Sequence, residues 1–106
     1  MSDKKSTAIS CLDLVEASNG LASCEFSSVE LVKACLDQIE LYDIHINAFT
    51  HINGVKALEE AKKSDSRRSS RTTLSKLDGI PIAVKDNIDV LGLPTTNGLN
   101  MKWCPE

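Results

Sequence analysis

The chain has 106 residues, a formal net charge of −3 and a hydrophobic fraction of 42%. That length is enough for one small domain with a modest core, and the composition excludes a disordered tail. The mild negative charge gives no electrostatic reason to expect a nucleic acid or an anionic lipid as a partner. No apolar stretch reaches the roughly 20 residues that cross a bilayer, and the polar start is not a secretory signal, so we expect a cytoplasmic chain without a membrane span.

The four cysteines, Cys11, Cys24, Cys35 and Cys104, stand apart in the sequence. They form no Cys-x-x-Cys pair, and no histidine lies at a zinc-ligand spacing from them. Without a signal peptide, free thiols are the better interpretation, and we expect Cys11 and Cys35 to be small core residues on helices. No glycine-rich phosphate loop is present either, so the sequence predicts no metal and no cofactor.

The first part of the chain is expected to be helical. Residues 1–8 are polar and are predicted to form a tail, ahead of a mostly helical region over 9–65. A first helix is predicted over Ile9–Ser18, where apolar residues share one face. Asn19 and Gly20 then supply a stop signal.

The second helix has the clearest signals. Ser27 and Glu30 form an S-x-x-E capping box, and Phe26 and Leu31 are placed for a hydrophobic staple. Apolar residues then recur at spacings of three and four until the predicted end near Asp43. The pattern indicates a helix with one buried face.

Three further segments follow before the most informative stretch. A short strand is predicted at Asn47–Ile52 and a helix over about Gly54–Ser64. Ser64–Lys76 has hardly any apolar residue, so it is expected to be a solvated polar loop.

The segment Leu77–Thr96 contains an apolar run that ends at Lys85. Ile- and Val-rich runs between glycine and proline turn signals are typical of a strand. A lysine at the end of such a strand either reaches water or is held where water is scarce. Removal of water favours the neutral amine, which can take a proton from a hydroxyl. The residues alone leave both interpretations of Lys85 open.

The last residues, 97–106, show no periodic pattern and are expected to be irregular. One clear strand, one weak strand and three helices cannot form a sheet with both faces covered. We therefore expect part of something larger, or a unit that borrows strands, with marginal stability and exposed apolar surface around Ile82 and Val84.

Residues 79–88 (GIPIAVKDNI), followed by 92–96 (GLPTT), resemble the lysine-bearing segment of the amidase signature family. Upstream, 31–39 resembles an early helix of that family, and 47–49 with 57–62 resemble the strand and helix that precede the lysine. The resemblance implies an α/β fold in which helices are followed by the core strands of a mixed sheet. This chain would be the N-terminal, incomplete portion of that fold.

The resemblance also implies a Ser–cis-Ser–Lys triad that hydrolyses amide C–N bonds, with Lys85 as its lysine. Asp86 and Asn87 are then expected to fix the local backbone and side-chain geometry. The family places both serines in a Gly/Ser-rich segment beyond the lysine, which this sequence does not contain.

We therefore expect an N-terminal fragment of an amide hydrolase that is inactive alone. The alternative is a non-catalytic relic or interaction module that needs a partner for stability. A complete enzyme would take a small-molecule amide and could form a homo-oligomer.

Overall fold

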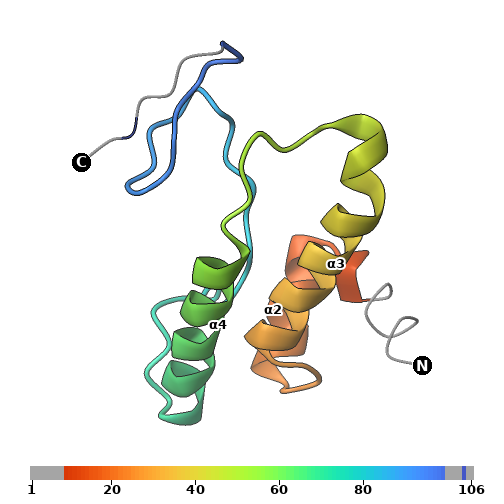
Figure 1. Ribbon diagram of the computed structural model, residues 1–106. Coiled ribbons are helices and arrows are strands. Elements are labelled where there is room, and N and C mark those ends of the chain that lie inside the picture. The colour runs from red at the N-terminus through yellow and green to blue at the C-terminus, as the bar shows by residue number, and fades with distance from the viewer. Residues whose placement is uncertain (1–8, 100–103, 105–106) are drawn as a thin grey trace.

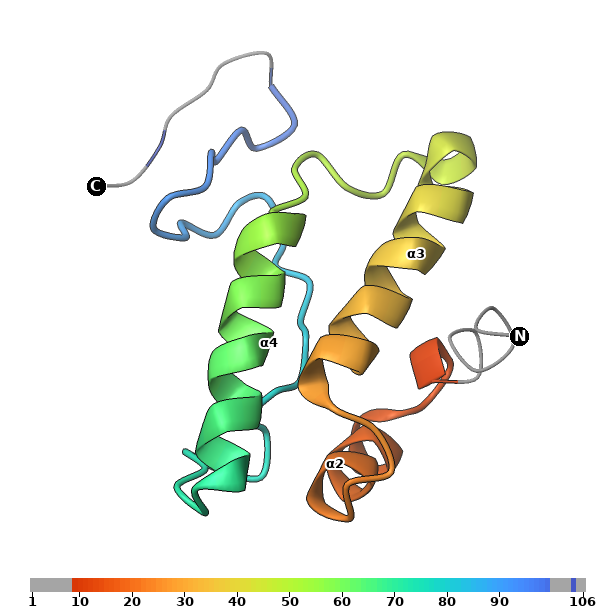
Figure 2. The same ribbon diagram turned by 60° about the horizontal axis from the view of Figure 1, so that its bottom comes forward.

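The computed structural model describes residues 9–99 and 104, in which the helices are α2 (Leu14–Ala22), α3 (Ser28–Ile46) and α4 (Gly54–Ser69). α3 and α4 lie side by side and run in opposite directions, and α2 lies beside the start of α3 (Figure 1). After α4 the chain turns back, passes along α4 and forms a loop near the start of that helix (Figure 2). The predicted tail and most of the predicted irregular end lie outside the described residues.

The apolar core lies where α2 meets the first half of α3. Leu21 of α2 is completely buried, and Phe26 and Leu31 belong to the same cluster on either side of the N-cap of α3, as a hydrophobic staple requires. The cluster consists of Ile9, Ala17, Leu21, Phe26, Leu31 and Ala34, with Leu12, Cys35 and Ile80 packed against it.

α3 begins as the sequence predicts. The Ser27 hydroxyl accepts a hydrogen bond from the Glu30 N–H at 3.1 Å, and the Glu30 carboxylate accepts one from the Ser27 N–H at 3.2 Å. These two bonds confirm the capping box. They use two of the backbone donors that a helix start leaves without intrahelical partners.

The predicted end of α3 near Asp43 is wrong by about one turn, because the helix continues to Ile46. Asn47 then ends it in the left-handed conformation, with φ 49°. The Asp43 carboxylate accepts hydrogen bonds from the N–H groups of Ala48 at 2.7 Å and Phe49 at 3.3 Å. These two bonds fix the backbone directly after the end of the helix.

The first helix was predicted too early in the chain. α2 begins only at Leu14, after the Asp13 N-cap, whose carboxylate accepts a hydrogen bond from the Glu16 N–H at 2.8 Å. The Glu16 side chain accepts the Asp13 N–H in return, at 3.4 Å. This second capping box starts the helix, so the prediction of Ile9–Ser18 is corrected to Leu14–Ala22.

Gly20 does not stop α2, as the sequence suggested, but lies within it. A Cβ atom added at this position would lie 2.3 Å from Cε1 of the Phe26 ring. Glycine is therefore needed at this position for packing, because a larger residue would occupy the space that the Phe26 ring fills.

α4 is longer than predicted and takes up the start of the segment that was expected to be a solvated loop. The helix continues beyond Ser64 to Ser69, and Ser64 is only 2% exposed. Some polar residues of these last turns contact other segments. The Asp65 carboxylate caps α3 by accepting the N–H groups of Ser28 at 2.7 Å and Val29 at 3.1 Å.

A buried carboxylate fixes the chain where it turns back after α4. The Asp78 side chain is 2% exposed and accepts hydrogen bonds from Nε and NH2 of Arg67, at 2.8 and 2.7 Å. It also accepts the Leu74 N–H at 3.0 Å, while Arg68 donates to the Asp78 carbonyl at 3.0 Å. The Arg67 hydrogen bonds are the main cause that holds the pKa of the Asp78 carboxyl well below its usual value.

We call these hydrogen bonds of Asp78 the Asp78 anchor. The next residue, Gly79, contacts both long helices, α3 and α4. It has φ 95°, and its carbonyl accepts a hydrogen bond from the Ser28 hydroxyl of α3 at 2.8 Å. A Cβ atom here would lie 2.7 Å from the Ser64 hydroxyl of α4. The position therefore requires glycine both for its backbone conformation and for its close contact with α4.

Neither predicted strand is present among the described residues. Asn47–Ile52 is an exposed connection between α3 and α4, and Leu77–Thr96 is irregular. A strand needs a neighbour for its backbone N–H and C=O groups, and in the described part of the chain no strand lies beside this segment. The described part is therefore helical, without the mixed sheet. The expected exposure of Ile82 (81%) and Val84 (44%) is confirmed.

We predict that Gly20→Ala destabilises the chain by about 1–3 kcal/mol, because the added methyl group forces the Phe26 ring out of the core. The shift of the urea unfolding midpoint measures this effect. Gly54→Ala is the matched control, since its Cβ atom would lie 3.5 Å from the nearest atom, an ordinary contact. Equal midpoints for Gly20→Ala and the unchanged chain would contradict the packing role.

We predict that Asp78→Asn lowers the free energy of unfolding near neutral pH by roughly 1.5–3 kcal/mol. The folded-state pKa of Asp78 is depressed, so its stabilising contribution is present above the usual value of 3.8 and is lost as the pH falls further. The difference between the two proteins should therefore shrink below that pH in urea titrations. Glu59→Gln, on the exposed face of α4, is the control. A difference that does not depend on pH would contradict the ion pair.

Candidate functional site

Lys85 lies in the irregular segment between the Asp78 anchor and the loop that follows it. Its carbonyl accepts a hydrogen bond from the Ile88 N–H at 3.0 Å, which closes a turn over residues 85–88. The residue is exposed, so the described part of the chain does not by itself exclude water from the amine. The catalytic role of Lys85 stays a prediction.

The residue after Lys85 is held by two neighbouring residues further along the chain. The Asp86 carboxylate accepts hydrogen bonds from the Thr96 N–H at 2.9 Å and from the Thr96 hydroxyl. The Asp86 carbonyl accepts the Asn97 N–H at 3.1 Å. We call these contacts the Asp86–Thr96 clamp. They confirm that Asp86 fixes the local geometry, whereas Asn87 is exposed.

The clamp also lowers the pKa of the Asp86 carboxyl. The hydrogen bond from the Thr96 hydroxyl is the largest cause that lowers the pKa of the Asp86 carboxyl, followed by the Thr96 N–H. Desolvation acts in the opposite direction, and the Thr50 side chain adds a smaller lowering effect. Asp86 is therefore an acceptor-only carboxylate at neutral pH, matched to two donors on one residue.

The clamped loop lies against the start of α4 and the connection before it. The side chain of Thr50, in the α3–α4 connection, lowers the pKa of the Asp86 carboxyl. On α4, Nζ of Lys56 would lie 3.6 Å from a Cβ atom added at Gly92. The loop that follows Lys85 lies at the end of the molecule away from α2 (blue in Figure 1).

The contact of Thr96 with Asp86 was not predicted from the sequence. Its signal was the Thr-Thr pair within the stretch that carries the family resemblance, but no local pattern indicated a partner ten positions upstream. Thr95 is 7% exposed, and its hydroxyl has no hydrogen-bond partner among the described residues.

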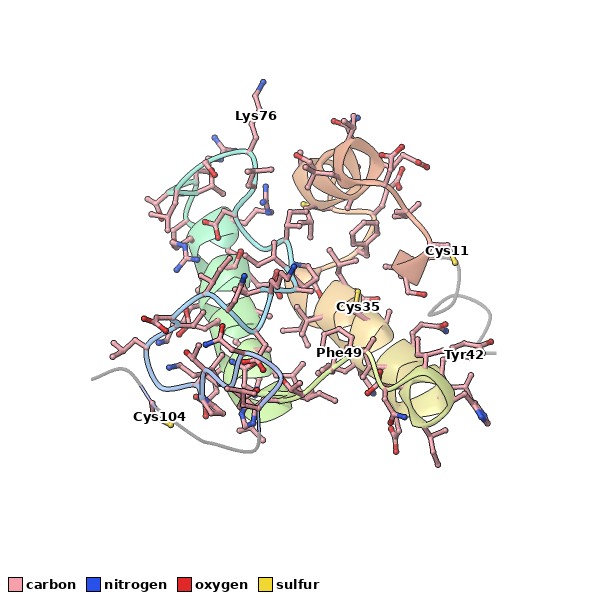
Figure 3. The ribbon with its side chains drawn as sticks, turned by 90° about the horizontal axis from the view of Figure 1, so that it is seen from above. Cys11, Cys35, Tyr42, Phe49, Lys76 and Cys104 are labelled. Carbon is pink, nitrogen blue, oxygen red and sulfur yellow. The ribbon has the colours of Figure 1, made fainter. Side chains whose placement is uncertain are left out.

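The cysteines make no disulfide in the part of the chain that the structure describes, and all four are free. Cys35 is half-buried against the core, but Cys11 is exposed, which corrects its predicted core position. Ile9 and Leu12, on either side of Cys11, take the core contacts instead. Figure 3 shows Cys11 and Cys104 on different sides of the molecule.

A hollow also lies away from Lys85. A shallow cavity of about 310 Å³ lies between α2, the start of α3 and the end of α4, and it includes Glu30, Asp65 and Arg68. Within residues 9–99 and position 104, no group of three or more His, Cys, Asp and Glu side chains is placed to hold a metal ion. None of the described helices has the length and apolar character of a membrane span.

The amidase family model matches residues 30–103, which include most of α3, all of α4, Lys85 and the Asp86–Thr96 clamp. Curated relatives that are each named as a subunit of glutamyl-tRNA(Gln) amidotransferase are similar in sequence. The protein of Chloroflexus aggregans is 42% identical over 92 residues, which cover 87% of this chain and 19% of the relative. The protein of Renibacterium salmoninarum is 46% identical over 78 residues, covering 74% of this chain and 15% of the relative.

The protein of Salinispora tropica is 38% identical over 101 residues, which cover 93% of this chain and 21% of the relative. The chain thus spans about a fifth of the length of the curated relatives it matches. No solved structure gives a significant match. Because the family match covers more than half of the sequence and includes the lysine-bearing segment, the chain belongs to the amidase signature family.

Proposed function

We propose that this chain supplies the lysine-bearing part of an amide hydrolase, with Lys85 as the base of a Ser–cis-Ser–Lys triad. The observation that carries the proposal is the extent of the amidase match, which runs through Lys85 and Asp86 and beyond Thr96. The clamp supports it, because a catalytic amine must be held at a defined position relative to the groups it serves.

In the proposed reaction, the neutral Lys85 amine takes a proton from a bridging serine, which takes one from the nucleophilic serine. The oxygen of the nucleophilic serine attacks the carbonyl carbon of the substrate amide, and the C–N bond breaks. The nitrogen of the substrate leaves with a proton that Lys85 returns through the bridging serine. Water then hydrolyses the acyl-enzyme. Neither serine is assigned to a residue of this chain, so the reaction needs further polypeptide.

The proposed base also needs a dry environment, because water favours the charged amine. Lys85 is exposed in the described part, and so are the apolar side chains of Ile82 and Val84 just before it. We propose that the rest of an amidase domain covers this segment. That cover would supply strand partners for the backbone and exclude water from the amine.

The relatives suggest the setting of the reaction. Their names describe them as one of the subunits of a glutamyl-tRNA(Gln) amidotransferase. We propose that this chain likewise belongs to such an enzyme and acts on a small amide that donates its nitrogen. The net charge of −3 favours a role with the small amide over direct contact with the tRNA.

The alternative function is a non-catalytic interaction module. The exposure of Lys85 favours it. The intact mass of the natural polypeptide separates the two functions. A mass near 11.5 kDa supports the module, and a mass several times larger supports the hydrolase.

We predict that Lys85→Ala, in the complete enzyme, lowers amide hydrolysis by about 10²–10⁴-fold, the usual contribution of a general base. The fold should be retained, as judged by circular dichroism. Lys76→Ala is the matched control, because this lysine is also exposed and extends from the loop after α4 (Figure 3). Full turnover by Lys85→Ala would refute the triad role.

A further inference from the structure

We propose that Asp86 and Thr96 are positioning residues, which hold the backbone of Lys85 so that its amine meets the bridging serine. This inference rests on the proposed function of Lys85. It adds two residues to the site, neither of which touches the reacting atoms.

The geometry around Lys85 supports the proposal from both sides. Upstream, the chain is fixed at Asp78 by Arg67 and at Gly79 by the Ser28 hydroxyl. Downstream, the clamp fixes the very next residue. The backbone that carries Lys85 is therefore held on both sides, at Asp78 and Gly79 before it and at Asp86 after it. A surface loop without a function would not need these hydrogen bonds.

The donors and acceptors of the clamp are complementary. Thr96 offers two donors, its N–H and its hydroxyl, to a carboxylate that only accepts. The Gly98 N–H donates to the Thr96 hydroxyl oxygen at 3.3 Å, so the hydroxyl accepts from one neighbour while it donates to Asp86. Asparagine in place of Asp86 would lose one acceptor oxygen and turn an NH2 group toward these donors.

The chain offers a matched control within the same loop. Asp89 carries the same charge as Asp86 but is exposed. Asp89→Asn therefore tests the change of charge alone. For the hydroxyl, Thr96→Ser keeps the donor and Thr96→Val removes it with little change of shape.

The clamp is first measured directly in the 106-residue chain by amide hydrogen exchange. We expect protection of the Thr96 and Asn97 amides in the unchanged chain, in Asp89→Asn and in Thr96→Ser, and loss of protection in Asp86→Asn and Thr96→Val. Exchange at Leu31 and Val32 in α3 reports whether the helical core is retained. Equal protection at Thr96 in all variants with an intact core would overturn the clamp.

The positioning role is then measured by amide hydrolysis in the complete enzyme. We expect Asp86→Asn and Thr96→Val to lower kcat by about a hundredfold, the cost of a misplaced group, with little change in KM. Thr96→Ser and Asp89→Asn should retain the activity of the unchanged enzyme. A change confined to KM, or no change in kcat, would overturn the proposal.

Combination with Lys85→Ala separates positioning from a general loss of structure. If Asp86 acts through Lys85, Asp86→Asn should have no further effect on kcat in the Lys85→Ala background. A further loss of similar size would overturn the positioning role. Failure of the proposed function has a different signature, because Lys85→Ala alone would then keep full turnover while the exchange at Thr96 still reports the clamp.

Discussion

The paired carboxylate of Asp78 is the interaction on which the arrangement of this chain depends. It joins the last turns of α4, through Arg67 and Arg68, to the segment that returns toward Lys85. Gly79 then connects the same point to α3 through the Ser28 hydroxyl. A buried charge of this kind is tolerated only when its hydrogen bonds are complete, so the anchor defines where the lysine-bearing segment begins.

The described residues fix the position of Lys85, but they do not exclude water from its amine as a lysine base would require. Hydrogen bonds at Asp78 and Asp86 define the backbone on both sides of it. The exposed state of the residue fits a chain that spans about a fifth of its relatives' length. Position and burial are separate requirements for an amine that accepts a proton, and the described residues meet the first without the second.

Several large apolar side chains of the described chain are exposed. Beyond Ile82 and Val84, the second half of α3 exposes Leu41 (59%), Ile44 (76%) and Ile46 (68%). Single exposed apolar residues are common in soluble proteins, and others lie elsewhere on the described chain, such as Val15 (67%) on α2 and Val55 (77%) on α4. In the core between α2 and the first half of α3, by contrast, Leu21 is fully buried and Leu31 is 3% exposed.

The sequence alone was sufficient for features whose partners lie within one helical turn. The Ser27–Glu30 capping box is an example, because both of its hydrogen bonds join residues three positions apart. The capping box of Asp13 was equally local, but the apolar residues before it, Ile9 and Leu12, moved the predicted helix upstream. The family followed from the unbroken stretch around Lys85, where residue types and spacing are both specific.

The tertiary structure decided what depends on neighbours distant in sequence. α4 continues past Ser64 because Asp65 and Arg67 find partners 36 and 11 positions away, and Asp86 is held by a threonine ten positions away. The predicted strand at Leu77–Thr96 failed for the same reason, since a strand exists only beside another strand. A sequence contains the donors and acceptors of each segment, but only the folded chain determines which of them lie within hydrogen-bonding distance of one another.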